Sequence, residues 1–136
     1  MNDTTSLISQ NKITFASLNK QELGKLGEKE AANCLRNKGL EILECNWRFG
    51  RLELDIIAKY KNTLVFVEVK SRSTDYFENP EDAVTPNKQK SMLKAASGYC
   101  QKMQHDGPVR FDVISVIIEP QEFRILHHED AFYPMG

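Results

Sequence analysis

The sequence predicts an α/β fold in which a central mixed β-sheet is flanked by helices, in the order α-β-β-β-α-β-β. The first observation is a pair of segments whose apolar residues recur at helical spacing. The second is a set of short runs rich in β-branched and aromatic residues around these segments. The third is that the second helical segment separates two apolar strands, a connection typical of parallel pairing.

Length and charge limit the class of protein. The 136 residues suit one domain with one core, and the net charge of −1 lowers the expectation of tight nucleic-acid binding without a metal. No apolar run approaches the ~20 residues that cross a bilayer, and the N-terminus lacks the pattern of a secretory signal. We therefore expect no membrane partner and a cytoplasmic location, in which the three cysteines stay reduced.

The N-terminal part is predicted to be a flexible tail followed by a helix. Residues 1–18 are polar and aperiodic, and residues 19–136 are expected to form a single domain. The helix is predicted over Lys20–Lys38, because Asn19 and Glu22 stand in a capping-box relation at its start. A glycine directly after this range is suited to end it.

Three strands are predicted next, over Glu41–Asn46, Arg51–Lys59 and Leu64–Ser71. The short link between the second and third favours a hairpin, so these two strands should pair antiparallel. Strict alternation on the second strand would put three side chains on one face and three on the other: Leu52, Leu54 and Ile56 against Glu53, Asp55 and Ile57.

The C-terminal half is predicted to contain a helix and two more strands. Thr85 and Pro86 are typical of a helix start, with threonine as the cap and proline in the first turn. The apolar stripe from this point continues to Met103. Beyond a turn, we expect a buried strand over Arg110–Ile118 and a short edge strand over Glu122–Leu126.

Two acids and a lysine form the candidate site. Glu68 and Lys70 share one face near the end of an apolar strand, and the hairpin brings Asp55 toward Glu68. Two carboxylates at that separation repel each other unless a cation lies between them. Oxygen ligands on a rigid sheet suit Mg²⁺, and the Lys70 amine would orient a water molecule or stabilise charge on a phosphate.

The same residues resemble a known nuclease signature. Asp55 followed by a hairpin and Glu68-Val69-Lys70 is similar to the D…(D/E)xK pattern of the restriction-endonuclease-like PD-(D/E)xK superfamily. Within it, the chain resembles most the YraN-type family of uncharacterised bacterial predicted endonucleases, which resemble archaeal Holliday-junction resolvases. The matching segments cover most of residues 20–118: "GKLGEKEAANCL", "GRLELDIIA", "LVFVEVKSR", "AVTPNKQKSMLKAASGYC" and "VRFDVISV".

The resemblance implies a metal-dependent endonuclease that hydrolyses DNA, branched or otherwise structured DNA included. Asp55 and Glu68 would hold Mg²⁺ or Mn²⁺, with the Val69 backbone carbonyl as a third ligand, and Lys70 would be the catalytic lysine. Several further residues would support the site or contact DNA: Glu28, Glu53 and Gln89 in support, and Lys88, Arg72 and Arg51 on the nucleic acid. Resolvase-like folds commonly act as dimers, so a homodimer is a further expectation. A leucine at position 52 departs from the glycine that the family often has there.

Structural alternatives remain open for these residues. Glu68 and Lys70 would also fit a cross-strand ion pair on a solvated face. Glu53 is more often a surface partner of Arg51 or Arg72, and Gln89 would also serve by bonding a loop. Asp112 is expected to be structural, capping a turn or pairing with Arg110, and His127 and His128 are expected on the surface. The alternative function is a non-catalytic module that binds nucleic acid or protein on the same scaffold.

Overall fold

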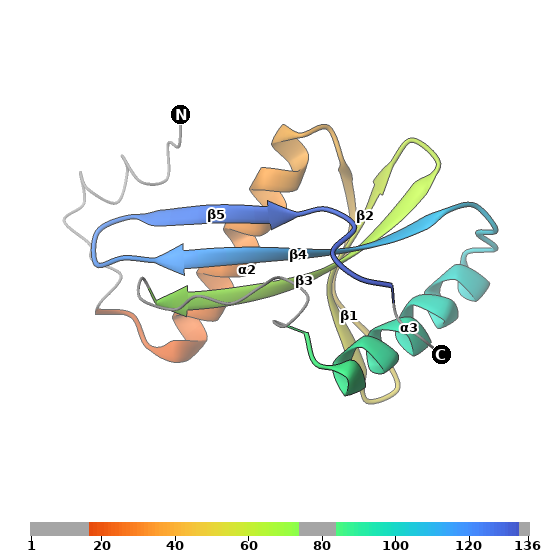
Figure 1. Ribbon diagram of the computed structural model, residues 1–136, viewed down its shortest axis with the longest axis horizontal. Coiled ribbons are helices and arrows are strands. Elements are labelled where there is room, and N and C mark those ends of the chain that lie inside the picture. The colour runs from red at the N-terminus through yellow and green to blue at the C-terminus, as the bar shows by residue number, and fades with distance from the viewer. Residues whose placement is uncertain (1–16, 74–83, 134–136) are drawn as a thin grey trace.

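The computed structural model describes residues 17–73 and 84–133. Its elements follow the predicted order α-β-β-β-α-β-β (Figure 1). The two helices are α2 (Lys20–Asn37) and α3 (Pro86–Lys102). The strands are β1 (Glu41–Phe49), β2 (Leu52–Tyr60), β3 (Thr63–Ser73), β4 (Val109–Ile118) and β5 (Phe123–His128). All but the last two residues of the predicted N-terminal tail lie outside the described ranges.

The five strands form one mixed sheet in the order β1-β2-β3-β4-β5. Neighbours joined by short turns pair antiparallel, and β3 and β4 pair parallel with α3 as their connection. The predicted mixed sheet is therefore confirmed. Figure 1 shows the β1–β2 hairpin crossing steeply to the direction of β4 and β5, with the two helices packed against the sheet.

Each face of the sheet packs against one helix. On the α3 face, Phe66 of β3 is fully buried with Tyr99 of α3 in one apolar cluster. On the opposite face, Val67 is buried with Ala31 and Leu35 of α2 in a second cluster. Adjacent residues of β3 thus enter different cores, as expected for a strand covered on both sides. In the described ranges, neither helix is long and apolar enough to span a membrane.

Both helices begin at the predicted caps. The Asn19 side chain accepts a hydrogen bond from the Glu22 N–H at 2.8 Å, and the Glu22 side chain accepts one from the Asn19 N–H at 2.9 Å. The Thr85 hydroxyl accepts from the Lys88 N–H at 3.2 Å, directly before Pro86. Local sequence is sufficient to start these helices, because the capping groups satisfy otherwise unpaired N–H groups.

The predicted alternation on β2 is wrong beyond Leu54. Leu54 and Ile57 lie in the cluster on the α3 face, whereas Ile56 lies in the cluster on the α2 face. The alternation of β2 side chains between the two faces is therefore displaced by one residue around Asp55. Opposite Asp55 on β1 stands Asn46, whose φ of 53° is left-handed. The hairpin therefore changes faces at this pair, and Asp55 is released from the regular pattern of the sheet.

Candidate active site

The site begins where β2 separates from β3. Counted from the hairpin turn, the paired register of these strands ends at Ile56 and Val67, and Asp55 is the next residue of β2. Beyond that point the Asp55 carboxylate replaces the missing backbone partner, and its Oδ2 accepts a hydrogen bond from the Val69 N–H at 2.8 Å. The side chain of Asp55 is thus fixed at the edge of β3 by the strand that carries the other predicted site residues.

The backbone of Val69 faces the same gap. The N–H and C=O of one residue in an extended strand point to the same side. Because the Val69 N–H is directed at Asp55, its carbonyl also points away from β4 and toward the departing β2 strand. The predicted third metal ligand therefore lies on the side of β3 that holds the Asp55 carboxylate.

Glu68 and Lys70 meet at the same end of β3. The Glu68 side chain is only 7% exposed, and its Oε2 lies 3.4 Å from the Lys70 Nζ. Its Oε1 lies 3.8 Å from the Lys88 Nζ, at the start of α3. The predicted alternative was a cross-strand ion pair on a solvated face, whereas Lys70 lies on the same strand as Glu68 and Glu68 is buried. Lys88, predicted to touch DNA, here balances the charge of Glu68.

The electrostatics of Asp55 identify a close acid pair. Burial raises the pKa of Asp55, the negative charge of Glu68 raises it further, and together they bring it to about 7. The hydrogen bond from the Val69 N–H opposes this shift, and the charge of Glu28 adds to it. A carboxyl group with this pKa is poorly accommodated as an anion unless a cation joins it.

Glu28 belongs to the same acidic group. Burial is the main cause that raises the pKa of Glu28, a hydrogen bond from Asn46 lowers it, and the charges of Glu53 and Glu68 raise it. Helix α2 therefore brings a further carboxylate beside the acids of the sheet. Asn46, the left-handed residue of β1, connects the strand distortion to this acid.

The remaining predicted residues are spread around the acids. Glu53 forms an ion pair with Arg48 at 3.9 Å, a partner that was not predicted from the sequence. The Gln89 side chain donates to the Val84 carbonyl at 3.0 Å, so it binds the segment before α3. Arg51 is exposed in the β1–β2 turn, and Arg72 is partly exposed on β3, two residues beyond Lys70.

The donor set fits a hard cation that keeps water ligands. Asp55, Glu68 and the Val69 carbonyl offer oxygen atoms, and Mg²⁺ is commonly held by one or two carboxylates together with water and phosphate. Across residues 17–73 and 84–133, no group of three or more His, Cys, Asp or Glu side chains is arranged as a preformed metal centre. Two carboxylates and one backbone carbonyl leave coordination positions that water and substrate oxygens would fill.

A basic hollow adjoins Glu28. Its volume is about 270 Å³, and it lies between α2 and β1. The charged and polar residues that line it are Lys25, Glu28, Lys29, Arg36 and Asn46. Cationic side chains beside an acidic site are suited to hold a polyanion whose phosphate is directed toward the acids.

Comparison with known proteins places the chain in a family. The model of the "Uncharacterised protein family UPF0102" matches residues 27–116. The chain belongs to the UPF0102 family. A UPF0102 protein from Phocaeicola vulgatus is 48% identical over 113 residues, which are 83% of this chain and 93% of that protein. One from Bacteroides thetaiotaomicron is 50% identical with the same shares. This membership confirms the resemblance to the YraN-type family.

Among solved structures, that of Pyrococcus furiosus SfsA in complex with Ca²⁺ aligns with this UPF0102 chain at a TM-score of 0.39 and 14% identity. The alignment covers 82% of this chain and 64% of that one.

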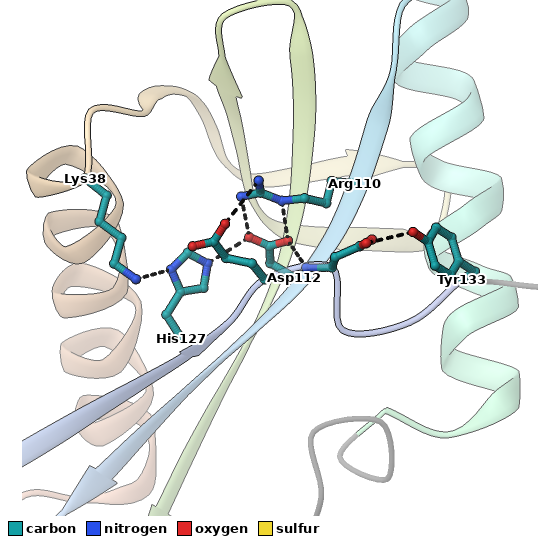
Figure 2. Close-up of polar contacts among 7 residues, drawn as sticks. Lys38, Arg110, Asp112, His127 and Tyr133 are labelled. Carbon is teal, nitrogen blue, oxygen red and sulfur yellow. Dashed lines mark hydrogen bonds and ion pairs between the residues drawn. The ribbon is translucent and has the colours of Figure 1, made fainter.

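The UPF0102 chain also contains a buried polar network, of which the sequence indicated only the pairing of Asp112 with Arg110 (Figure 2). Asp112 of β4 is fully buried, and Arg110 donates to both of its oxygens at 2.9 Å. His127 of β5 lies 2.7 Å from Asp112, and the Asp130 N–H donates to Asp112 at 2.9 Å. The network therefore joins β4, β5 and the segment that follows β5.

His127 is not a surface histidine, contrary to the prediction, because its side chain is only 2% exposed. The Lys38 Nζ lies 2.8 Å from its Nδ1. Since the lysine ammonium has only donors, Nδ1 must accept, and Nε2 carries the proton toward Asp112. The predicted pairing of Asp112 with Arg110 is confirmed. No local pattern indicated that His127 and Lys38 would join this pair, because both are distant from it along the chain.

Proposed function

We propose that this UPF0102 protein is a metal-dependent endonuclease that hydrolyses phosphodiester bonds of DNA. The observation that carries the proposal is the position of Asp55. Its carboxylate accepts a hydrogen bond from the Val69 N–H. Burial and the negative charge of the nearby Glu68 together raise the pKa of Asp55 to about 7. An acid pair held at the open end of a sheet, next to a lysine, matches the D…(D/E)xK resemblance stated from the sequence.

The proposed chemistry divides among the residues of this chain. Asp55, Glu68 and the Val69 carbonyl would hold Mg²⁺ or Mn²⁺, which when bound polarises the phosphate and lowers the pKa of water. Lys70 would orient the attacking water and stabilise negative charge on the phosphate. The attacking water loses a proton to solvent as its oxygen bonds to phosphorus, the P–O3′ bond breaks, and the leaving O3′ takes a proton from solvent.

Glu28 and the basic side chains have supporting roles in this proposal. Glu28 would orient a water molecule of the metal through hydrogen bonds. When a metal ion neutralises Glu68 in place of Lys88, the Lys88 side chain at the start of α3 would leave Glu68 and contact phosphate. Lys25, Lys29 and Arg36 would hold the DNA backbone beside Glu28.

The test is cleavage of duplex, tailed and branched DNA with Mg²⁺ and with Mn²⁺. We expect strand scission that EDTA abolishes and that Asp55→Asn, Glu68→Gln and Lys70→Ala each reduce at least 100-fold. The matched controls are Glu41→Gln and Lys59→Ala on exposed parts of β1 and β2, which should leave cleavage within about twofold.

Two results would contradict the proposal. Cleavage that survives both Asp55→Asn and Lys70→Ala would mean that the activity resides elsewhere or in a contaminant. Metal-independent DNA binding without scission under every condition would favour the non-catalytic module. The ion pairs of Glu68 with Lys70 and Lys88 are the observation that favours that alternative, because they neutralise the acid without a metal.

A further inference from the structure

A second hollow lies on the α3 face, between the end of the β1–β2 hairpin and the first half of α3. Its volume is about 590 Å³, within the range of pockets that hold a small ligand. The hairpin and the helix supply its walls, with Phe49, Arg51 and Leu52 from one and Lys90, Ser91 and Lys94 from the other. The hollow thus combines an apolar floor with cationic side chains around it, and a ligand for it would have to match both.

The aromatic wall of this hollow is packed against its neighbours. The Phe49 side chain is held although the residue is 39% exposed, because its ring lies against Gly98 of α3, where a Cβ would clash with it. Trp47 stacks on Phe49 at 6.0 Å with an interplanar angle of 21°, and Tyr99 supports Trp47 edge-on at 5.1 Å. An exposed ring that is already fixed loses little freedom when a flat ligand stacks on it.

The charge of the hollow selects an anion. Arg51, Lys90 and Lys94 are exposed, and no ion pair joins any of them to another residue of the described ranges. Lys90 and Lys94 are four residues apart on α3 and so extend on the same side of the helix. Among the residues that the structure describes, none of those that line the hollow is acidic. An aromatic face beside several cations is the chemistry that binds single-stranded nucleic acid.

The hollow is connected to the acids along both of its walls. Ser91 lies one helical turn from Lys88, whose Nζ is 3.8 Å from Glu68. Leu52 lies three residues before Asp55, about 10 Å along the strand at ~3.3 Å per residue. That distance is about three nucleotide steps of a DNA strand at ~3.4 Å per step. A base inside a duplex cannot present its face to Phe49, whereas an unpaired base can.

We propose that this Phe49 hollow binds an unpaired nucleotide of DNA beside the acids. The inference rests on the proposed function and narrows it, because the substrate becomes DNA in which a duplex meets a single-stranded segment. The base stacks on Phe49, and Arg51, Lys90 and Lys94 hold the phosphates of the same strand. The duplex part then extends toward the acids and the α2 side.

The experiment measures binding of fluorescent DNA to the full chain in Ca²⁺, with intact DNA verified on a denaturing gel. Wild-type protein should bind a duplex with a single-stranded tail at least tenfold tighter than the matched blunt duplex. Phe49→Leu should lower the affinity for tailed DNA about tenfold and leave blunt-duplex binding unchanged. Tyr60→Leu is the matched control, because Tyr60 is equally exposed, at 39%, on the opposite end of β2.

Two further arms make the assignment specific. An abasic site at one position of the tail should lower the affinity of the wild type for tailed DNA as much as Phe49→Leu does. With the abasic site at that position, Phe49→Leu should cause no additional loss of affinity. Lys90→Ala combined with Lys94→Ala should weaken tailed-DNA binding and reduce its dependence on salt by about one to two released counterions. Lys102→Ala, at the far end of α3, is the control for charge.

The outcomes separate this inference from the proposed function. Equal affinity for tailed and blunt DNA, or additive effects of the abasic site and Phe49→Leu, would overturn the nucleotide site even if the protein cleaves DNA. A Phe49-dependent preference for tailed DNA in a protein that never cleaves would support the site and contradict only the catalytic proposal. Absence of binding to any DNA would overturn both.

Discussion

At the scale of single residues, the main finding is that Asp55 is placed where its charge is unfavourable. Burial and the neighbouring Glu68 raise its pKa to about 7, although its carboxylate accepts a hydrogen bond from the Val69 N–H. Residues that act on a ligand often lower the stability of the free protein in this way. Protonation relieves this cost at low pH, and in the proposed function a bound cation would relieve it at neutral pH.

This environment predicts that Asp55→Asn stabilises the metal-free protein. A carboxyl whose folded pKa is raised holds its proton more tightly when folded, so stability falls as the pH rises from about 4 to about 7. Asparagine keeps an acceptor for the Val69 N–H and has no charge. In EDTA at pH 8, thermal melts should show a gain of about 1–3 kcal/mol, which disappears near pH 4.

Magnesium supplies the control for that prediction. Adding Mg²⁺ at pH 8 should raise the melting temperature of the wild type and not that of Asp55→Asn, because only a binding-competent folded state gains stability from the ligand. Glu41→Gln, an exposed acid on β1, should change neither curve. A loss of stability in Asp55→Asn at pH 8 would mean that the charge of Asp55 is compensated in the free protein.

Sequence reasoning located some of these residues and missed others. Asp55, Glu68 and Lys70 were found because their spacing on a hairpin is a local property. His127 was wrongly expected on the surface, since its burial depends on Lys38 and Asp112, which are distant along the chain. Phe49 was equally unpredicted, because its ring is positioned by Gly98 of α3, which is distant along the chain.

At the scale of elements, the helices and the strand order were predictable, whereas the shape of the β1–β2 hairpin was not. Caps at Asn19 and Thr85 are written in neighbouring residues. The change of face at Asp55 depends on the left-handed Asn46 across the hairpin and on the acid of α2 that Asn46 bonds. A period-two pattern contains no information about such a pair.

The left-handed conformation predicts a specific ranking of Asn46 variants. Asn46→Ala should lower the free energy of unfolding by about 1–2 kcal/mol, because alanine adopts a φ of 53° less readily than asparagine and loses the hydrogen bond to Glu28. Asn46→Gly loses the same hydrogen bond to Glu28 and relieves the backbone, so it should be the more stable of the two. Urea unfolding measures both. Equal stabilities would show that the backbone at this position relaxes without cost.

At the scale of the whole molecule, helix α2 contacts two regions with opposite electrostatics. Its Glu28 stands among acids that raise one another's pKa, and the residue after its end, Lys38, bonds His127 of the buried network. Burial alone would raise the pKa of Asp112, but hydrogen bonds from His127, Arg110 and the Asp130 N–H outweigh it and lower that pKa. The fold thus contains one acid that is destabilised as an anion and one that is stabilised.

These two acids predict the pH profile of the metal-free protein. The stability that a depressed pKa contributes is present above the unfolded value of about 3.9 and is lost as the pH falls through the folded pKa. Asp112 therefore destabilises the fold in strong acid, while Asp55 destabilises it progressively between about pH 4 and 7. In EDTA, the highest stability should lie at about pH 4–6, and Mg²⁺ should move it toward neutral pH.

Variants of Asp112 and Glu129, the two acids that contact Arg110, test how much of the pH dependence of stability comes from the buried network. Asp112→Ala should lower the free energy of unfolding at pH 7 by about 3–5 kcal/mol, because it leaves Arg110 and His127 without their buried acceptor. Glu129→Ala, which removes an exposed partner 3.3 Å from the same guanidinium, should cost less than about 1 kcal/mol. Urea midpoints from pH 3 to 8 measure both. If the loss of stability in strong acid is as steep in Asp112→Ala as in the wild type, groups other than Asp112 set the acid limit of this fold.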